Sequence, residues 1–384
     1  MTDAAIGAAS SASLPESGKR VTWTELFFDL VFAYAITQVS ELLSAQHTPS
    51  HVGRALIVFI PVYWTWVGAT MHGSLHDVDR PKTRIGIFIV ALIGLFMALA
   101  VPASFGPDGV LFGASYWAAR VVLLVLVRAA YRGTRFNSFV VAAVVSGPLL
   151  LVGGFVDENV RVVLWGLAAC IDVSVPYLAR RRLVGIPFEP AHLAERYGLF
   201  VIIALGESVV AIGVSAGHQS VTPTLLSAMA VSFTLTVALW WVYFVYAAAA
   251  IRYGLQRADV PIEVIRPVLP YGHLGFVAGI IASATAVGAV IAEPSSHLGF
   301  EMAALLFGGV ALYLATFGYT RWAMFRTVSG PRLIAASVCV MVVPAAVAVP
   351  AGAALLILTV IVVSLNLIEA HLVPPGASWL ATHE

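Results

Sequence analysis

Twelve apolar runs of about 18 to 28 residues divide this chain, and nearly all of its basic residues lie between them. A helix rises 1.5 Å per residue, so roughly 20 residues cross the ~30 Å hydrocarbon layer of a bilayer. Each run is long enough to be one span. The sequence therefore predicts an all-α, polytopic integral membrane protein with about twelve transmembrane helices. We place them near residues 24–44, 54–73, 84–105, 110–131, 137–156, 160–180, 195–216, 224–251, 271–292, 298–320, 332–349 and 351–371.

The basic residues predict an orientation, because 18 of the 21 Lys and Arg residues fall in alternate connections. The opposite connections hold only Arg54 and Arg161, and a third exception, Arg120, lies inside a span. Cytoplasmic loops of membrane proteins carry the excess of Lys and Arg, so we expect both termini in the cytoplasm and the protein in the cell (inner or plasma) membrane. The basic residues on the predicted cytoplasmic side are Lys19, Arg20, Arg80, Lys82, Arg84, Arg128, Arg132, Arg135, Arg180, Arg181, Arg182, Arg196, Arg252, Arg257, Arg266, Arg321, Arg326 and Arg332.

Composition excludes most other classes of protein. The chain is 60% hydrophobic and 11% charged, and its mean hydropathy is +0.93, values that a soluble core of this size could not hide from water. Its formal charge is +1 and is spread over short loops, which excludes a nucleic-acid patch. Cys170 and Cys339 both lie within predicted spans, so neither a disulfide framework nor a cysteine metal site is expected. No cofactor or metal is implied, and the lipid bilayer is the expected partner.

The two halves of the chain resemble each other. The second spans carry Trp64 with Trp66 and Trp240 with Trp241, and the third spans close with Pro102 and Pro294. Six spans per half would make the halves parallel repeats related by an axis along the membrane normal. The alternative is that any helix-and-loop membrane protein places such residues similarly. We expect a disordered cytoplasmic tail at 1–19, membrane repeats at 20–182 and 183–372, and a cytoplasmic tail at 373–384.

Glu207 is the first candidate site residue, because it falls about twelve residues into a 22-residue span. A charge at a helix centre costs roughly 2.5 to 3.5 kcal/mol on insertion scales, so it should face protein or water. Such an acid, with Ser208 beside it, could bind a proton or a cation, or could only hydrogen-bond between helices. A strip of Gly198, Gly206 and Gly213 borders it, where another helix can approach closely and a homodimer could form.

Asp29 and Arg120 are further buried charges. Asp29 lies about one turn inside the first span, where Arg128 or Arg196 could pair with it. It could tie helices together or hold a cation or proton at the inner mouth. Arg120 stays charged in the middle of the fourth span and needs an acidic or carbonyl partner. Asp172 and Glu207 are the acids at similar depth, and the sequence leaves the pairing open.

Three stretches carry a family resemblance. ELFFDLVF at residues 25–32 with AITQ at 35–38, ERYGLF at 195–200 with LGES at 205–208, and YGHL at 271–274 resemble signatures of the bacterial low temperature requirement protein A family. The resemblance covers about residues 20–372. It implies a multi-pass membrane fold and a link to growth in the cold, but no substrate.

Three functions remain after enzymes are set aside, since no nucleophilic triad, P-loop or dinucleotide turn is present. We expect transport of a small solute or ion through a site with Glu207, Asp29, Arg120, Asp172 and Ser208. The first alternative is a cation channel, since the residues around Asp29 also look like a signature of six-plus-six-span potassium channels. The second half lacks that acid. The other alternative is a membrane scaffold or sensor in envelope or cold adaptation.

Overall fold

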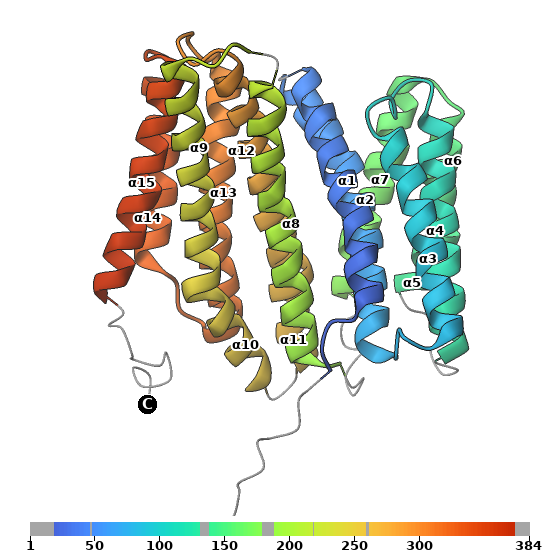
Figure 1. Cartoon of the computed structure of the whole chain (residues 1–384). Coiled ribbons are helices and arrows are strands. Elements are labelled where there is room, and N and C mark those ends of the chain that lie inside the picture. The colour runs from blue at the N-terminus through green and yellow to red at the C-terminus, as the bar shows by residue number, and fades with distance from the viewer. Residues whose placement is uncertain are drawn as a thin grey trace, which may run out of the picture.

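The computed structural model describes residues 19–46, 48–130, 138–178, 188–217, 219–258 and 261–372. Across those ranges the chain forms helices and no named strand, so the all-α prediction is confirmed (Figure 1). Both predicted tails lie almost wholly outside the described residues, as do the predicted cytoplasmic residues Arg132, Arg135, Arg180, Arg181 and Arg182.

The first half begins at a capping box, in which the Thr22 side chain accepts from the Glu25 amide and the Glu25 carboxylate accepts from the Thr22 amide. The second half begins at Pro190, which suits a first helical turn because that turn needs no amide donor. The first-half elements are α1 (Trp23–Ala45), α2 (Pro49–Leu75), α3 (Pro81–Ala100), α4 (Gly109–Ala130), α5 (Ser138–Val141), η1 (Ala142–Ser146), α6 (Gly147–Gly154) and α7 (Glu158–Leu178). The second-half elements are α8 (Pro190–Ala216), α9 (Pro223–Trp241), η3 (Val242–Ala247), α10 (Ala248–Gln256), α11 (Pro261–Arg266), η4 (Pro267–Gly272), α12 (His273–Ala292), α13 (Phe300–Phe325), α14 (Gly330–Ala346) and α15 (Ala351–Leu372).

The helices have the lengths that a bilayer requires. Among the described residues, ten helical segments are long and apolar enough to cross a membrane, and two shorter apolar ones cover Ser138–Gly154 and Gly330–Ala346. Each predicted span coincides with one of these segments. Helices suit this setting because every backbone polar group must be satisfied internally in hydrocarbon. The polytopic membrane fold is thus confirmed, and the exact number of twelve stays a prediction.

One helix begins earlier than the sequence suggested. The span expected at 271–292 is preceded by helix from Pro261 onward, through α11 and the π-helical segment η4. Pro267 and Pro270 lie in η4, before the first residue of the predicted span. The wider π-helical turns accommodate prolines that would break a regular α-helix.

The order of neighbouring helices is the same in both halves. α1 packs on α3, α3 on α4, α4 on α6 and α6 on α7; in the same way α8 packs on α12, α12 on α13, α13 on α14 and α14 on α15. The halves meet where α1 contacts α8 and α12, and where α2 contacts α8. In Figure 1, α1 and α2 lie between the two groups of helices. This arrangement agrees with a duplication, which itself stays a prediction.

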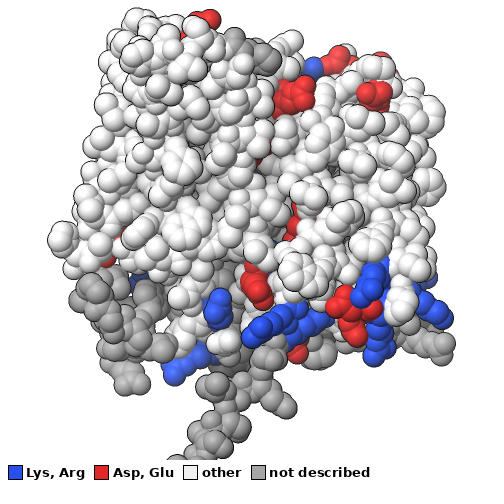
Figure 2. All heavy atoms as spheres, viewed as in Figure 1, with Lys and Arg blue, Asp and Glu red and all other residues white. Residues whose placement is uncertain are grey.

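Charge separates the two ends of the bundle. Lys and Arg gather at the lower end in Figure 2, where α1 begins and α15 ends in Figure 1. At the other end Arg54 pairs with Glu158. The buried Arg161 of α7 donates to backbone carbonyls at the end of α6 and in the turn between α3 and α4, which explains an arginine on the less basic side. These carbonyls belong to Ser104, Gly106, Gly153, Gly154 and Val156.

The backbones of α12 and α13 pack closely against each other. A Cβ added to Gly279 would lie 2.6 Å from the Gly309 carbonyl oxygen, whereas one added to the neighbouring Gly308 would meet nothing within 4 Å. We therefore expect Gly279→Val to destabilise the protein by about 1 to 3 kcal/mol through overpacking, and Gly308→Val to change little. Thermal unfolding of the purified protein in detergent measures this. Equal midpoints for the two variants would contradict the packing described.

Candidate functional site

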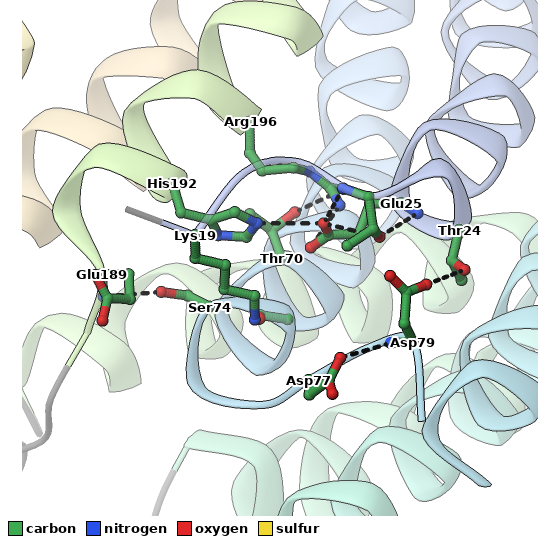
Figure 3. Close-up of polar contacts among 12 residues, drawn as sticks. Lys19, Thr24, Glu25, Thr70, Ser74, Asp77, Asp79, Glu189, His192 and Arg196 are labelled. Carbon is green, nitrogen blue, oxygen red and sulfur yellow. Dashed lines mark hydrogen bonds and ion pairs between the residues drawn. The ribbon is translucent and has the colours of Figure 1, made fainter. Parts of the chain in front are cut away.

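A cluster of buried polar side chains joins the two halves near the basic end of the bundle. We call it the inner ion cluster, and Figure 3 shows part of it. All of its members are buried. They come from α1, α2 and α8, and they are Glu25, Asp29, Trp66, Thr70, His192 and Arg196.

Local sequence explains how the charges meet. Glu25 and Asp29 are four residues apart on α1, and His192 and Arg196 are four apart on α8, so each pair occupies one face of its helix. Arg196 Nη1 lies 3.1 Å from Glu25 Oε1, and Arg196 Nη2 donates to Asp29 Oδ1 at 2.6 Å. His192 Nε2 lies 3.2 Å from Glu25 Oε2. Of the two partners that the sequence allowed for Asp29, Arg196 is the one in contact.

Helix α2 completes the cluster from the side. Trp66 Nε1 donates to Asp29 Oδ1 at 2.7 Å, and Arg196 Nη2 donates to Thr70 Oγ1 at 3.4 Å. A Cβ on Gly73 would lie 2.6 Å from Glu25 Oε1. The glycine therefore allows the Glu25 carboxylate to approach the backbone of α2.

The cluster carries more acid than permanent base. The carboxylates of Glu25 and Asp29 face a single arginine, Arg196, which is 1% exposed. His192 also contacts Glu25, but its charge depends on its protonation. Asp29 Oδ2 is buried and has no hydrogen-bond partner among the described residues. This oxygen is a place where a proton or a cation would be stabilised.

Lys19 lies just outside the membrane-spanning part and closes the cluster from below. Its ammonium donates to the backbone carbonyls of Gly73 and His76 at the end of α2. Burial lowers the pKa of Lys19 below its usual value, because desolvation of the ammonium outweighs the attraction of Glu25. A cation is favourable there because helix C-termini carry partial negative charge.

Glu207 occupies a second position on the same interface. Thr37 Oγ1 of α1 donates to Glu207 Oε2 of α8 at 2.6 Å, and Ser40 of α1 is 3.0 Å from Thr285 of α12. The Glu207 side chain is buried, and none of the ion pairs among the described residues includes it. Ser208 is also buried, and as the next residue it points about 100° around α8 from Glu207.

Arg120 and Asp172 form a third group, within the first half. Arg120 Nη2 of α4 lies 3.5 Å from Asp172 Oδ2 of α7, and the Tyr116 hydroxyl lies between them, accepting from Arg120 Nε and donating to Asp172. Arg120 Nη1 donates to the Trp64 carbonyl oxygen. Asp172 is thus the acid beside Arg120, and Glu207 is left without that partner. The five residues expected in one site therefore lie in three places.

Two of the three glycines in the strip beside Glu207 have no close neighbour among the described residues. A Cβ on Gly206 or Gly213 would meet no described atom within 4 Å, whereas the buried Gly198 packs against η3, where an added Cβ would lie 3.7 Å from Phe244 and 4.0 Å from Tyr243. The expected close approach of another helix is therefore wrong for Gly206 and Gly213 within the described part of the chain. Gly213 is exposed and Gly206 is partly exposed.

Sequence reasoning missed Glu25, His192 and Trp66 as site residues. The matched spacing of two acids on one helix and two bases on another was the available signal, and it requires knowledge that α1 and α8 are neighbours. Among the described residues, no three His, Cys, Asp or Glu side chains lie close enough together to hold a metal ion.

Comparison with known proteins identifies the family. The model of the family described as bacterial low temperature requirement A protein (LtrA) matches residues 20–367. The chain belongs to the LtrA family. An uncharacterized Rhizobium meliloti protein, RA0937, is 30% identical over 309 residues, which cover 77% of this LtrA-family chain and 76% of the relative.

A second relative matches only part of the chain. The ESX-3 secretion system protein EccD3 of Mycobacterium tuberculosis is 37% identical over 90 residues, which cover 23% of this chain and 19% of that protein. No solved structure matches the LtrA-family chain.

The inner ion cluster predicts a strong dependence on Arg196. Arg196→Gln would leave Glu25 and Asp29 buried without their arginine, so we expect a loss of about 3 to 5 kcal/mol of stability. Adding Asp29→Asn should restore part of the loss, because it removes one unpaired carboxylate. Thermal unfolding in detergent measures both.

The exposed pair of Arg84 with Asp79 is the control, and Arg84→Gln should cost only about 0 to 1 kcal/mol. If Arg196→Gln were as mild as Arg84→Gln, the cluster would not hold the halves together.

Proposed function

We propose that this LtrA-family protein transports a proton or a small cation along the interface between its halves, with Glu207 as the exchangeable acid. The observation that carries the proposal is the setting of Glu207, which is 6% exposed, accepts from the Thr37 hydroxyl and has no basic partner among the described residues. A carboxylate buried in this way is stabilised by taking up a proton or a cation. Exchange of that proton or cation with water is the elementary step of transport.

Oxygen atoms around Glu207 suit this role. The hydroxyls of Thr37, Ser40 and Thr285 come from two helices that face α8, and hydroxyl and carboxylate oxygens are ligands for hard cations and relays for protons. The three hydroxyls lie on the interface between α1 and α12, so the site has contributions from both halves.

An apolar stretch separates Glu207 from the inner ion cluster. Asp29 and Thr37 are eight residues apart on α1, or about 12 Å along the helix. Phe32 and Ile36 lie between them on the same stripe and are buried. Passage between the two polar regions would need α1 and α8 to move apart, and this fits a transporter whose halves rock about a central site.

Orientation and location are part of the proposal. We assign the end that carries Lys19 and Arg196 to the cytoplasm, because the positive residues gather there. The inner ion cluster would then lie at the cytoplasmic entrance, and the membrane would be the inner or plasma membrane.

Flux in sealed proteoliposomes tests the transport proposal. With pH-sensitive and potassium-sensitive dyes inside and an imposed gradient, we expect wild-type flux above that of empty vesicles and a loss of at least tenfold in Glu207→Gln, since a missing ionisable group typically costs this much or more. Thr37→Val should give an intermediate rate.

Glu41→Gln is the matched control, because Glu41 is an exposed acid on α1. Its flux should equal that of the wild type. Equal flux in Glu207→Gln and wild type would contradict the role of Glu207, and no flux of any tested ion would favour a scaffold or sensor.

A cation channel is the second candidate, favoured by Asp29 within the channel-like stretch of α1. Arg196 and Trp66 both hold Asp29 Oδ1 in this structure. Electrical recording separates the two functions, because a channel carries far more ions per second than a transporter and needs no coupled gradient.

A further inference from the structure

A cavity lined by residues of both halves is not used by the proposed transport route. It has a volume of about 100 Å³ and lies between α2, α4, α5, η1 and α7 of the first half and α11 and η4 of the second. Its wall is mostly apolar, and four charged or titratable side chains also line it. The apolar lining includes Trp64, Val67, Met71, Val141, Ile171 and Tyr271, and the charged or titratable lining is His72, Arg120, Asp172 and Arg266.

The charges that line the cavity do not balance. Arg120 faces Asp172 at 3.5 Å, whereas Arg266 donates to the Pro176 backbone carbonyl and forms no ion pair with any described carboxylate. Arg266 is only 9% exposed. Two arginines therefore share one acid in an apolar setting, and a buried charge there calls for a counter-charge.

Arg120 and Arg266 both line the cavity beside α7. Asp172 and Pro176 are four residues apart, so they occupy one face of that helix, one turn from each other. Arg120 contacts the first and Arg266 the second. An anion placed against this face could reach both.

Buried donors that line the cavity also lack acceptors. Arg120 Nη2 has no hydrogen bond in the described structure, and neither ring nitrogen of His72, a residue that is 2% exposed, has one. Arg120 reaches α2 at Gly68, where an added Cβ would lie 3.2 Å from Nη1, and His72 is one turn further along the same face. A buried donor without an acceptor is costly, so these groups indicate a missing ligand with acceptor oxygens.

We infer that this cavity binds a small organic acid, whose carboxylate would be held by Arg266 and Arg120 and whose short apolar body would pack against Trp64 and Tyr271. The carboxylate supplies the absent negative charge and accepts from Arg120 Nη2, which lies 3.5 Å from Asp172 and makes no hydrogen bond among the described residues. His72 is placed to donate a further hydrogen bond. The inference does not rest on the transport proposal, because Glu207 and the inner ion cluster lie outside this cavity's lining.

The size of the cavity limits the ligand. A cavity of about 150 Å³ holds benzene, so one of this volume suits an acid with a carbon chain of about three to five atoms. Butyrate is a suitable probe, and butyramide is its neutral counterpart of nearly the same shape. With so few atoms, a dissociation constant on the order of millimolar is expected.

Binding to the purified full-length protein in detergent is the test, measured by titration with saturation-transfer NMR of the probe. We expect saturable binding of butyrate and at least tenfold weaker binding of butyramide. Arg266→Gln should weaken butyrate at least tenfold, because it removes the arginine that lacks an acid.

Two further variants keep the test decisive. Met71→Trp fills the cavity without touching the arginines and should abolish binding while the thermal midpoint stays near that of the wild type. Arg84→Gln removes an exposed arginine and should bind butyrate normally. Equal binding of butyrate and butyramide, wild-type affinity in both Arg266→Gln and Met71→Trp, or no saturable butyrate binding would each overturn the inference.

Discussion

The pairing of Arg196 with Glu25 and Asp29 is the contact on which the relation between the two halves depends. An unpaired buried charge is far more costly than a paired one, so α8 must keep Arg196 against the two acids of α1. The same pairing fixes the position of α8 along α1, and so also which residues meet further along this interface. With Arg196 placed beside Asp29, Glu207 of α8 comes opposite Thr37 of α1.

The other buried arginines follow the same constraint in different ways. Arg161 is satisfied by backbone carbonyls of the connections beside α6, and Arg332 by Glu369. Arg120 pairs with Asp172 and Tyr116, but its Nη2 makes no hydrogen bond among the described residues. Arg266 is different because it donates to a backbone carbonyl, that of Pro176, and forms no ion pair with a described carboxylate. A buried charged group that lacks an ion-pair partner within a membrane protein marks a place where a ligand, an ion or a proton is expected to bind. Glu207 and Arg266 are such groups of opposite sign, in different parts of the fold.

Much of the architecture could be predicted from sequence, because hydropathy and the distribution of Lys and Arg report depth in a bilayer. Depth also limited the partners of Asp29 to Arg128 or Arg196. Depth does not report which way a side chain faces around its helix, so it could not choose Asp172 over Glu207 for Arg120, nor bring His192 to Glu25. The early start of helix at Pro261 is not evident from sequence, because prolines disfavour a regular α-helix and only the π-helical turns of η4 accommodate Pro267 and Pro270. Because depth does not report rotation about a helix, the sequence also could not show which way the glycines of α8 face around that helix.

Chemical labelling of Glu207 tests the central claim most directly. A hydrophobic carbodiimide reacts with a protonated carboxyl group in apolar surroundings, and mass spectrometry of peptides locates the adduct. If Glu207 exchanges a proton or a cation, labelling should occur there and should fall as the pH rises or as the transported cation is added. A Glu207 that stays unlabelled at every pH, or is labelled equally at every pH and cation concentration, would contradict the account.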